Sequence, residues 1–160
     1  ALLNMTAPTA LLGDGREVLC AFDLPPSGAD RRLCDVAVAA SARQWRGLVA
    51  GLEELGVRHC YSDFYLATKV AFLSAERVVC SAKLGPTTTE YFFEYRREVE
   101  AAPAAAYLAV NHAQADKLER RLERLGVARR RRDLMKPVLY DLSRKVDPQE
   151  LFPEREFPLR

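Results

Sequence analysis

The sequence predicts an α/β fold in three layers: a mostly parallel, mixed sheet with helices on its faces and a β-hairpin near the C-terminus. Short apolar runs alternate with amphipathic helical patterns, as in parallel strands joined by helices. Two helical patterns end in a glycine, Gly56 or Gly126, that leads directly into a β-rich run. After Gly126 two β-rich segments follow closely, which predicts an antiparallel edge.

The length and composition fit one globular domain. A chain of 160 residues with 49% hydrophobic and 29% charged residues is ordinary for a protein that buries roughly two-thirds of its unfolded surface. We divide it into a loose lead-in (1–15), a single α/β domain (16–143) and an extended, proline-rich surface tail (144–160). No apolar run reaches the roughly 20 residues of a membrane-spanning helix. The chain starts with Ala, which fits a processed protein or a domain cut from a longer one.

The first elements are a short strand and a long helix. Residues 17–23 read as a strand, and the Pro-Pro-Ser-Gly segment 25–28 closes it. A helical pattern then covers about 35–55, with one apolar face. That face contains Trp45, Leu48, Val49, Leu52 and Leu55. Gly56 follows as the C′ residue, because glycine adopts the left-handed cap conformation without a Cβ penalty.

The middle of the chain alternates strands and helices. Residues 58–62 read as a strand, 64–73 as a helix and 77–82 as a second strand. Thr87, with Glu90 three residues later, forms a capping box that opens a helix ending near residue 99.

The last part repeats the pattern and closes it with a hairpin. Residues 106–110 are a compact apolar strand, and a helix begins near Asn111 or His112. Segments 127–134 and 137–143 then form the hairpin. The residues expected to be buried on the helix are Ala115, Leu118, Leu122 and Leu125.

The four cysteines do not predict a metal site. Cys20, Cys34, Cys60 and Cys80 contain no CxxC spacing and no paired Cys/His spacing, which argues against structural zinc. Cys60 and Cys80 fall inside expected strands, where buried free thiols are common. The even count permits a Cys20–Cys34 bridge without requiring one, so the redox compartment stays open. We predict no cofactor and no metal.

Polar groups at three expected strand ends form the candidate binding site. In open α/β sheets, ligands bind beyond the carboxyl ends of the strands. Ser62-Asp63, Ser81 to Lys83, and Asn111-His112 all fall there, and the loop 85–89 adjoins the second. Such groups suit a hydroxyl-rich or anionic ligand. The candidate residues are Asp63, Tyr65, Lys83, Thr87, Thr88, Thr89 and Asn111.

Each candidate also has a purely structural interpretation. Asp63 can cap its helix by accepting backbone N–H groups. Thr87 pairs most simply with Glu90 in a capping box. Lys83 can be a solvated loop lysine, and Tyr65 can pack at the rim of the core. His59 and His112 have no evident ligand partner in the sequence, so neither is predicted as a metal ligand or general base.

The charge balance disfavours a nucleic-acid partner. The formal charge is +2, from 24 Lys and Arg against 22 Asp and Glu. The four arginines at 129–132 lack interleaved aromatic residues, and an edge strand that repels other strands explains them. A lipid-headgroup contact is the better alternative if the domain lies beside a membrane.

No catalytic motif is present. The sequence contains no GxSxG elbow, P-loop, HExxH or strand-linked GxGxxG. Cys60 and Cys80 have no specific His/Asp arrangement near them in sequence. An independent enzyme is therefore disfavoured, and a small enzyme that uses either thiol is kept as the third hypothesis.

A set of short motifs resembles a known family. A helix ending in Leu-Gly-Val at 55–57 is followed by Tyr-Ser-Asp-Phe-Tyr at 61–65 and Phe-Leu-Ser-Ala-Glu-Arg at 72–77. A later αβ unit with a hairpin covers 116–143. Over about 43–143 this order resembles the soluble C-terminal region of bacterial polytopic membrane glycosyltransferases of the dolichyl-phosphate-mannose protein mannosyltransferase-like class.

The resemblance implies an accessory domain on the extracytoplasmic (periplasmic) face of a bacterial membrane, attached to a membrane-embedded sugar-transfer portion of a longer parent. The implied partners are a glycan or a polyprenyl-phosphate-linked sugar. In that family the catalytic acid belongs to the membrane part, and no position here matches it, so no catalytic residue is transferred. The alternative function is a protein-interaction module that docks through the hairpin edge and the C-terminal tail.

Overall fold

The computed structural model describes residues 9–11, 17–19, 28–84, 92–134 and 136–153. The chain divides into two compact units, Ala1–Gly47 and Leu48–Arg160. This division places a boundary inside the single domain expected over 16–143.

The first unit contains a two-stranded sheet and most of the long helix. Strand β1 (Thr9–Leu11) pairs antiparallel with β2 (Glu17–Leu19). Helix α1 (Gly28–Glu54) begins here, earlier than the sequence pattern indicates. The expected lead-in 1–15 thus includes a strand. Cys34 is buried and disulfide-bonded, and Cys20, the partner that the sequence permits, lies outside the described residues.

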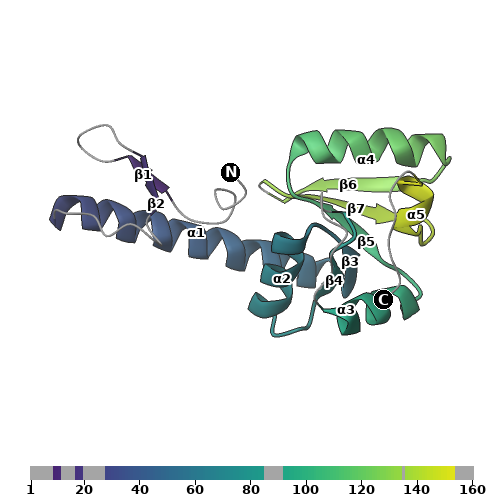
Figure 1. Ribbon diagram of the computed structural model, residues 1–160, viewed down its shortest axis with the longest axis horizontal. Coiled ribbons are helices and arrows are strands. Elements are labelled where there is room, and N and C mark those ends of the chain that lie inside the picture. The colour runs from purple at the N-terminus through teal and green to yellow at the C-terminus, as the bar shows by residue number, and fades with distance from the viewer. Residues whose placement is uncertain (1–8, 12–16, 20–27, 85–91, 135, 154–160) are drawn as a thin grey trace. The chain divides into compact units, whose positions relative to one another are not determined.

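The second unit is built on one mixed five-stranded sheet. Its strands are β3 (His59–Tyr61), β4 (Val79–Ser81), β5 (Ala106–Ala109), β6 (Arg129–Asp133) and β7 (Val138–Leu142), in the order β4-β3-β5-β7-β6. Strand β3 is parallel to both β4 and β5, whereas β7 is antiparallel to β5 and β6 (Figure 1). The predicted α/β class, mixed sheet and terminal hairpin are confirmed.

Helices pack on both faces of this sheet. Helices α3 (Phe93–Ala101), α4 (His112–Arg124) and α5 (Pro148–Leu151) contribute to one core with the inward side chains of β3, β5 and β7. Figure 1 shows α4 along β6 and β7. Helix α2 (Phe64–Leu73) packs on β4 with its own buried face. The main members of the shared core are Tyr61, Tyr107, Tyr140, Val99, Ala115, Leu118, Leu122, Val146 and Leu151.

The two glycine stops have the predicted conformation. Gly56 has φ = 72° and Gly126 has φ = 62°, in the left-handed region that favours glycine. Beyond each glycine the next N–H returns to the helix: that of Val57 donates to the carbonyl of Leu52 at 2.9 Å, and that of Val127 to Leu122 at 3.1 Å. These bonds satisfy carbonyl groups that the ends of α1 and α4 would leave free.

Some expectations differ from the structure. Leu55 and Leu125 were expected on buried helix faces, but each is 37% exposed, because the helix ends before it and the chain turns away. The region 144–152, expected as an extended tail, contains α5, and Phe152 is buried. Asp147 and Glu150 form a capping box around Pro148, a local helix start that explains the difference.

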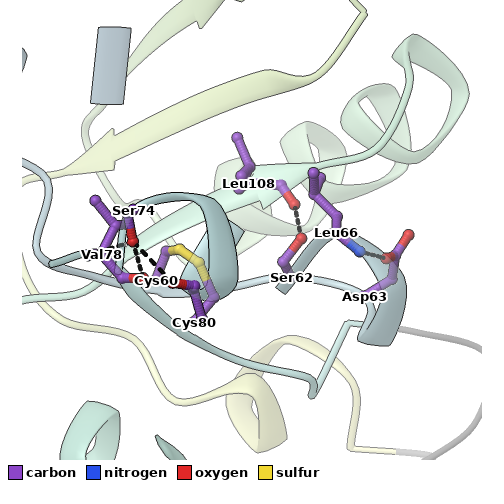
Figure 2. Close-up of a disulfide and its surroundings, with 9 residues drawn as sticks. Cys60, Ser62, Asp63, Leu66, Ser74, Val78, Cys80 and Leu108 are labelled. Atoms are coloured by element: carbon purple, nitrogen blue, oxygen red, sulfur yellow. Dashed lines mark hydrogen bonds between the residues drawn. A yellow bond between two sulfur atoms is a disulfide. The ribbon is translucent and has the colours of Figure 1, made fainter. Parts of the chain in front are cut away.

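The expectation of free thiols at Cys60 and Cys80 is wrong. Both side chains are buried as expected, but their sulfur atoms form a disulfide (Figure 2). The two residues are direct partners in the parallel register of β3 and β4, with Cα atoms 4.3 Å apart. Alternation along β3 directs Tyr61 into the core shared with α3 and α4, and Cys60 to the opposite face.

Candidate functional site

The carboxyl ends of β3, β4 and β5 meet at one edge, as predicted. The N–H of Ser62 donates to the carbonyl of Ser81 at 2.9 Å. Its hydroxyl donates to the carbonyl of Leu108 at 2.8 Å (Figure 2). Ser62 is fully buried, so its hydroxyl links the ends of β3 and β5 inside the protein and does not face solvent.

Asp63 caps α2. Its Oδ1 accepts the N–H of Leu66 at 2.8 Å (Figure 2). Burial raises the pKa of the carboxyl, and the hydrogen bonds from the N–H groups of Leu66 and Tyr65 partly offset this effect. The capping interpretation of Asp63 is confirmed, and a ligand contact by the same side chain stays a prediction.

Asn111 has the same role at the start of α4. Its Oδ1 accepts the N–H of Gln114 at 2.9 Å. Gln114 in turn accepts the N–H of Val110 at 2.7 Å and donates to the carbonyl of Leu84 at 3.3 Å. This amide joins the ends of β4 and β5, so Asn111 and Gln114 hold the edge together.

Lys83 is buried, so its interpretation as a solvated loop lysine is wrong. Only 7% of the residue is exposed. Its ammonium group lies 2.5 Å from Oε1 of Glu100 and 4.0 Å from Oδ2 of Asp147. The same Glu100 oxygen accepts Nε of Arg96 at 2.9 Å. Lys83 therefore belongs to an ion-pair network that joins β4 to α3.

Tyr65 has the most exposed side chain among the candidate residues that the structure describes. It is 43% exposed, on the first turn of α2, and Phe72 seven residues later is 81% exposed. Lys69 lies between them in sequence, and spacings of four and three residues place all three on one helix face. Thr87, Thr88 and Thr89, with the expected capping box, lie outside the described residues.

Neither histidine is isolated. Nε2 of His59 lies 3.1 Å from Oε1 of Glu98. Nδ1 of His112 lies 3.1 Å from Nη2 of Arg131 and 3.8 Å from Oδ1 of Asp133. Within the described ranges no group of three His, Cys, Asp or Glu side chains is arranged to hold a metal ion.

The arginine run is an edge strand, as predicted. Arg129 and Arg131 face α4: Arg129 reaches Glu123 at 2.5 Å, and both reach Glu119, at 3.1 and 3.0 Å. Arg130 and Arg132 alternate onto the opposite face of the sheet. Arg129 and Arg131 thus hold α4 against the sheet, whereas Arg130 and Arg132 place their positive charge on the opposite face.

Sequence reasoning missed a cavity at the other edge of the sheet. It lies at the amino ends of β3 and β5 and has a volume of about 350 Å³. Its lining includes Arg58 and Arg132, which the sequence places 74 positions apart. The available signal was the alternation of the arginine run, which predicts that Arg132 faces away from α4.

Comparison of the chain with protein-family models, curated proteins and solved structures finds no match. Among the helices of the described residues, none combines the length and the apolar character needed to cross a bilayer.

Proposed function

We propose that the chain is an accessory, non-catalytic recognition domain of a membrane glycosyltransferase-like protein. It helps to hold a glycan or a polyprenyl-phosphate-linked sugar beside the membrane-embedded portion of a longer parent, on the extracytoplasmic face. The observation that carries the proposal is the exposed Tyr65 on the first turn of α2, at the carboxyl edge of the sheet, with Lys69 and the exposed Phe72 farther along the same helix face.

The chemistry of this face suits a sugar. An exposed aromatic ring offers an apolar surface, and the tyrosine hydroxyl adds a polar tip that can bond a sugar hydroxyl. Asp63 and Ser62 are engaged in internal hydrogen bonds, and these bonds fix the first turn of α2. Tyr65 is therefore presented from a rigid support rather than from a loop, which lowers the entropic cost of binding.

The cysteine chemistry supports the proposed location. Cys34 is disulfide-bonded and Cys60 is joined to Cys80. Disulfides persist in oxidising compartments such as the periplasm and are rare in the cytosol. The disulfide also argues against an enzyme with Cys60 or Cys80 as nucleophile, because a bonded sulfur offers no thiolate.

The test is a titration of the chain with methyl α-mannoside and with a short-chain polyprenyl phosphomannose, followed by NMR. We expect Tyr65→Ala to weaken binding by roughly threefold to tenfold, as expected for the loss of one aromatic contact. Phe93→Ala is the matched control, because Phe93 is 40% exposed on α3. Unchanged affinity in Tyr65→Ala, or equal losses in both variants, would remove the proposal.

One observation favours the second function, docking of another protein. In the described part of the sheet, β6 pairs with β7 on one side and with no strand on the other, and such an edge can accept an added strand. Deleting 144–160 would remove the buried Val146, Leu151 and Phe152. The discriminating variant is therefore deletion of 154–160 alone: loss of association with a partner protein, with the fold and glycan binding intact, would favour docking.

A further inference from the structure

The cavity at the amino edge of the sheet is walled by four segments of the second unit. The turn after α1 supplies Leu55 to His59, the segment before β5 supplies Pro103 to Ala106, and β6 supplies Arg132. The end of β7 and the following turn supply Leu139, Asp141, Leu142, Arg144 and Lys145. At about 350 Å³ the cavity is within the usual range for a small-molecule site.

Its charge is strongly one-sided. Among the described residues, the lining holds Arg58, Arg132, Arg144 and Lys145, besides His59, against the single carboxylate of Asp141. The whole chain is nearly balanced at +2, so this excess is local. A concave wall of one sign concentrates its field and attracts ligands of the opposite sign.

Two of these cations are already engaged. Arg144 donates to Glu150, with Nη2 3.0 Å from Oε2. Lys145 donates to the carbonyl groups of Val99, Glu100 and Ala102 at 2.6–2.7 Å. Lys145 therefore caps the C-terminus of α3, and its charge stays at the cavity wall with no carboxylate of the described residues at hydrogen-bond distance.

The other two cations, Arg58 and Arg132, have no such partner in the part of the chain that the structure describes. Within the described ranges, neither the Arg58 nor the Arg132 guanidinium forms an ion pair or a side-chain hydrogen bond. Asp141 likewise has no ion pair there, although its cross-strand partner is Arg130. Two free guanidinium groups over one cavity would repel each other unless solvent or an anion lies between them.

The backbone explains why these two arginines share the cavity. Arg58 comes two residues after the left-handed Gly56, and its carbonyl accepts the N–H of Val79 at 2.8 Å. Arg132 is opposite Leu139 in the hairpin register, and Leu139 also lines the cavity. Each guanidinium is thus carried by backbone that the sheet holds in place.

We propose that this cavity binds a small phosphorylated ligand, with Arg58 and Arg132 as the phosphate-binding residues. Guanidinium groups bind phosphate oxygens through two parallel N–H bonds, which a single lysine cannot do. The remaining wall, mainly Leu55, Val57, Ala104, Ala105 and Leu142, suits a compact, partly apolar body attached to the phosphate. The cavity is at the opposite strand ends from Tyr65, so phosphate binding there can be tested independently of the proposed glycan contact.

The test is a titration of the 160-residue chain with inorganic phosphate and with glucose 1-phosphate at low ionic strength, followed by NMR shifts of backbone amides around Gly56 and Ala105. We expect saturable binding that weakens with added salt. Arg58→Gln and Arg132→Gln should each reduce affinity by roughly tenfold or more, as for loss of a charge-assisted bond. Asp141→Asn should tighten binding, a gain that structural damage would not produce.

The matched control is Arg120→Gln. Arg120 is exposed on α4 and away from the cavity lining, so the change removes the same charge and should leave affinity within about twofold. A second arm replaces the soluble probes by phosphatidylcholine vesicles with and without phosphatidylglycerol. Binding to these vesicles that is lost in Arg58→Gln would identify a lipid headgroup as the source of the phosphate. Absence of saturable binding in both arms, or equal losses in all arginine variants, would overturn the proposal.

Discussion

The ammonium group of Lys83 lies 2.5 Å from Oε1 of Glu100, in a position where the lysine side chain is 7% exposed and the glutamate side chain 33%. Arg96 shares the same carboxylate oxygen, and its side chain is 10% exposed. One carboxylate thus offsets two nearly buried cations. Burying a charge without a close partner is costly, and Glu100 is the carboxylate that lies within 3 Å of both cations.

We predict unequal costs within this network. Glu100→Gln removes the carboxylate that both cations share, although Asp147 stays 4.0 Å from the ammonium group of Lys83, and should lower the free energy of unfolding by about 3 kcal/mol. Lys83→Met keeps the volume, removes one charge and leaves the Arg96–Glu100 pair, so it should cost less than half as much. Urea denaturation followed by circular dichroism measures both. A larger loss for Lys83→Met would contradict the dependence on Glu100.

Glu100 also determines the direction in which the stability of the protein changes with pH. Burial disfavours ionisation of Glu100, but hydrogen bonds from Lys83 and Arg96 outweigh it and lower the pKa below 4.5. The stability that this ionised carboxylate contributes is fully present above the pKa of Glu100 in the unfolded chain. It is lost as the pH falls through the lower pKa of Glu100 in the folded protein. Asp63 has a raised pKa and acts in the opposite direction. Between about pH 5 and pH 3, the wild type should therefore lose more stability than Glu100→Gln.

Much of the fold follows from local patterns. The two Gly-terminated helices, the hairpin and the helix 64–73 were predictable, because amphipathic period, capping and turn residues act within a few positions. Ser62, Asp63 and Asn111 were placed correctly at one edge because the ends of parallel strands meet there.

The site was less predictable because its contacts join distant segments. Lys83 appears as a loop lysine in sequence, and nothing local indicates that Glu100 and Arg96 will cover it. The cavity depends on Arg58 and Arg132, which come together only through the strand order of the sheet. Likewise, the pairing of Cys60 with Cys80 required knowledge that β3 and β4 are neighbours in that register.

We predict that Cys60 and Cys80 are not alkylated by iodoacetamide in the folded, non-reduced protein. Their bridge closes a loop with a sequence separation of 20 residues, and in the chain-entropy description such a crosslink contributes about 3 kcal/mol. Intact mass before and after reduction in denaturant tests the bond. The double variant Cys60→Ala/Cys80→Ala should unfold at lower urea concentration, whereas rapid alkylation of the native protein would exclude the disulfide.

Three glycines provide a matched set for the last prediction. Gly56 and Gly126 have positive φ, and an added Cβ would meet no atom within 4 Å at either. Alanine at either position should therefore lower the free energy of unfolding by about 1 kcal/mol from backbone strain alone, without any clash.

Gly51 lies inside α1, where an added Cβ would meet Leu134 at an ordinary 3.8 Å. Gly51→Ala should stabilise the protein by roughly 0.5–1 kcal/mol, because alanine loses less backbone entropy in a helix. Thermal and urea unfolding of the three single variants would show opposite signs for Gly51→Ala and the other two, and a common sign would contradict the conformations assigned to the helix ends.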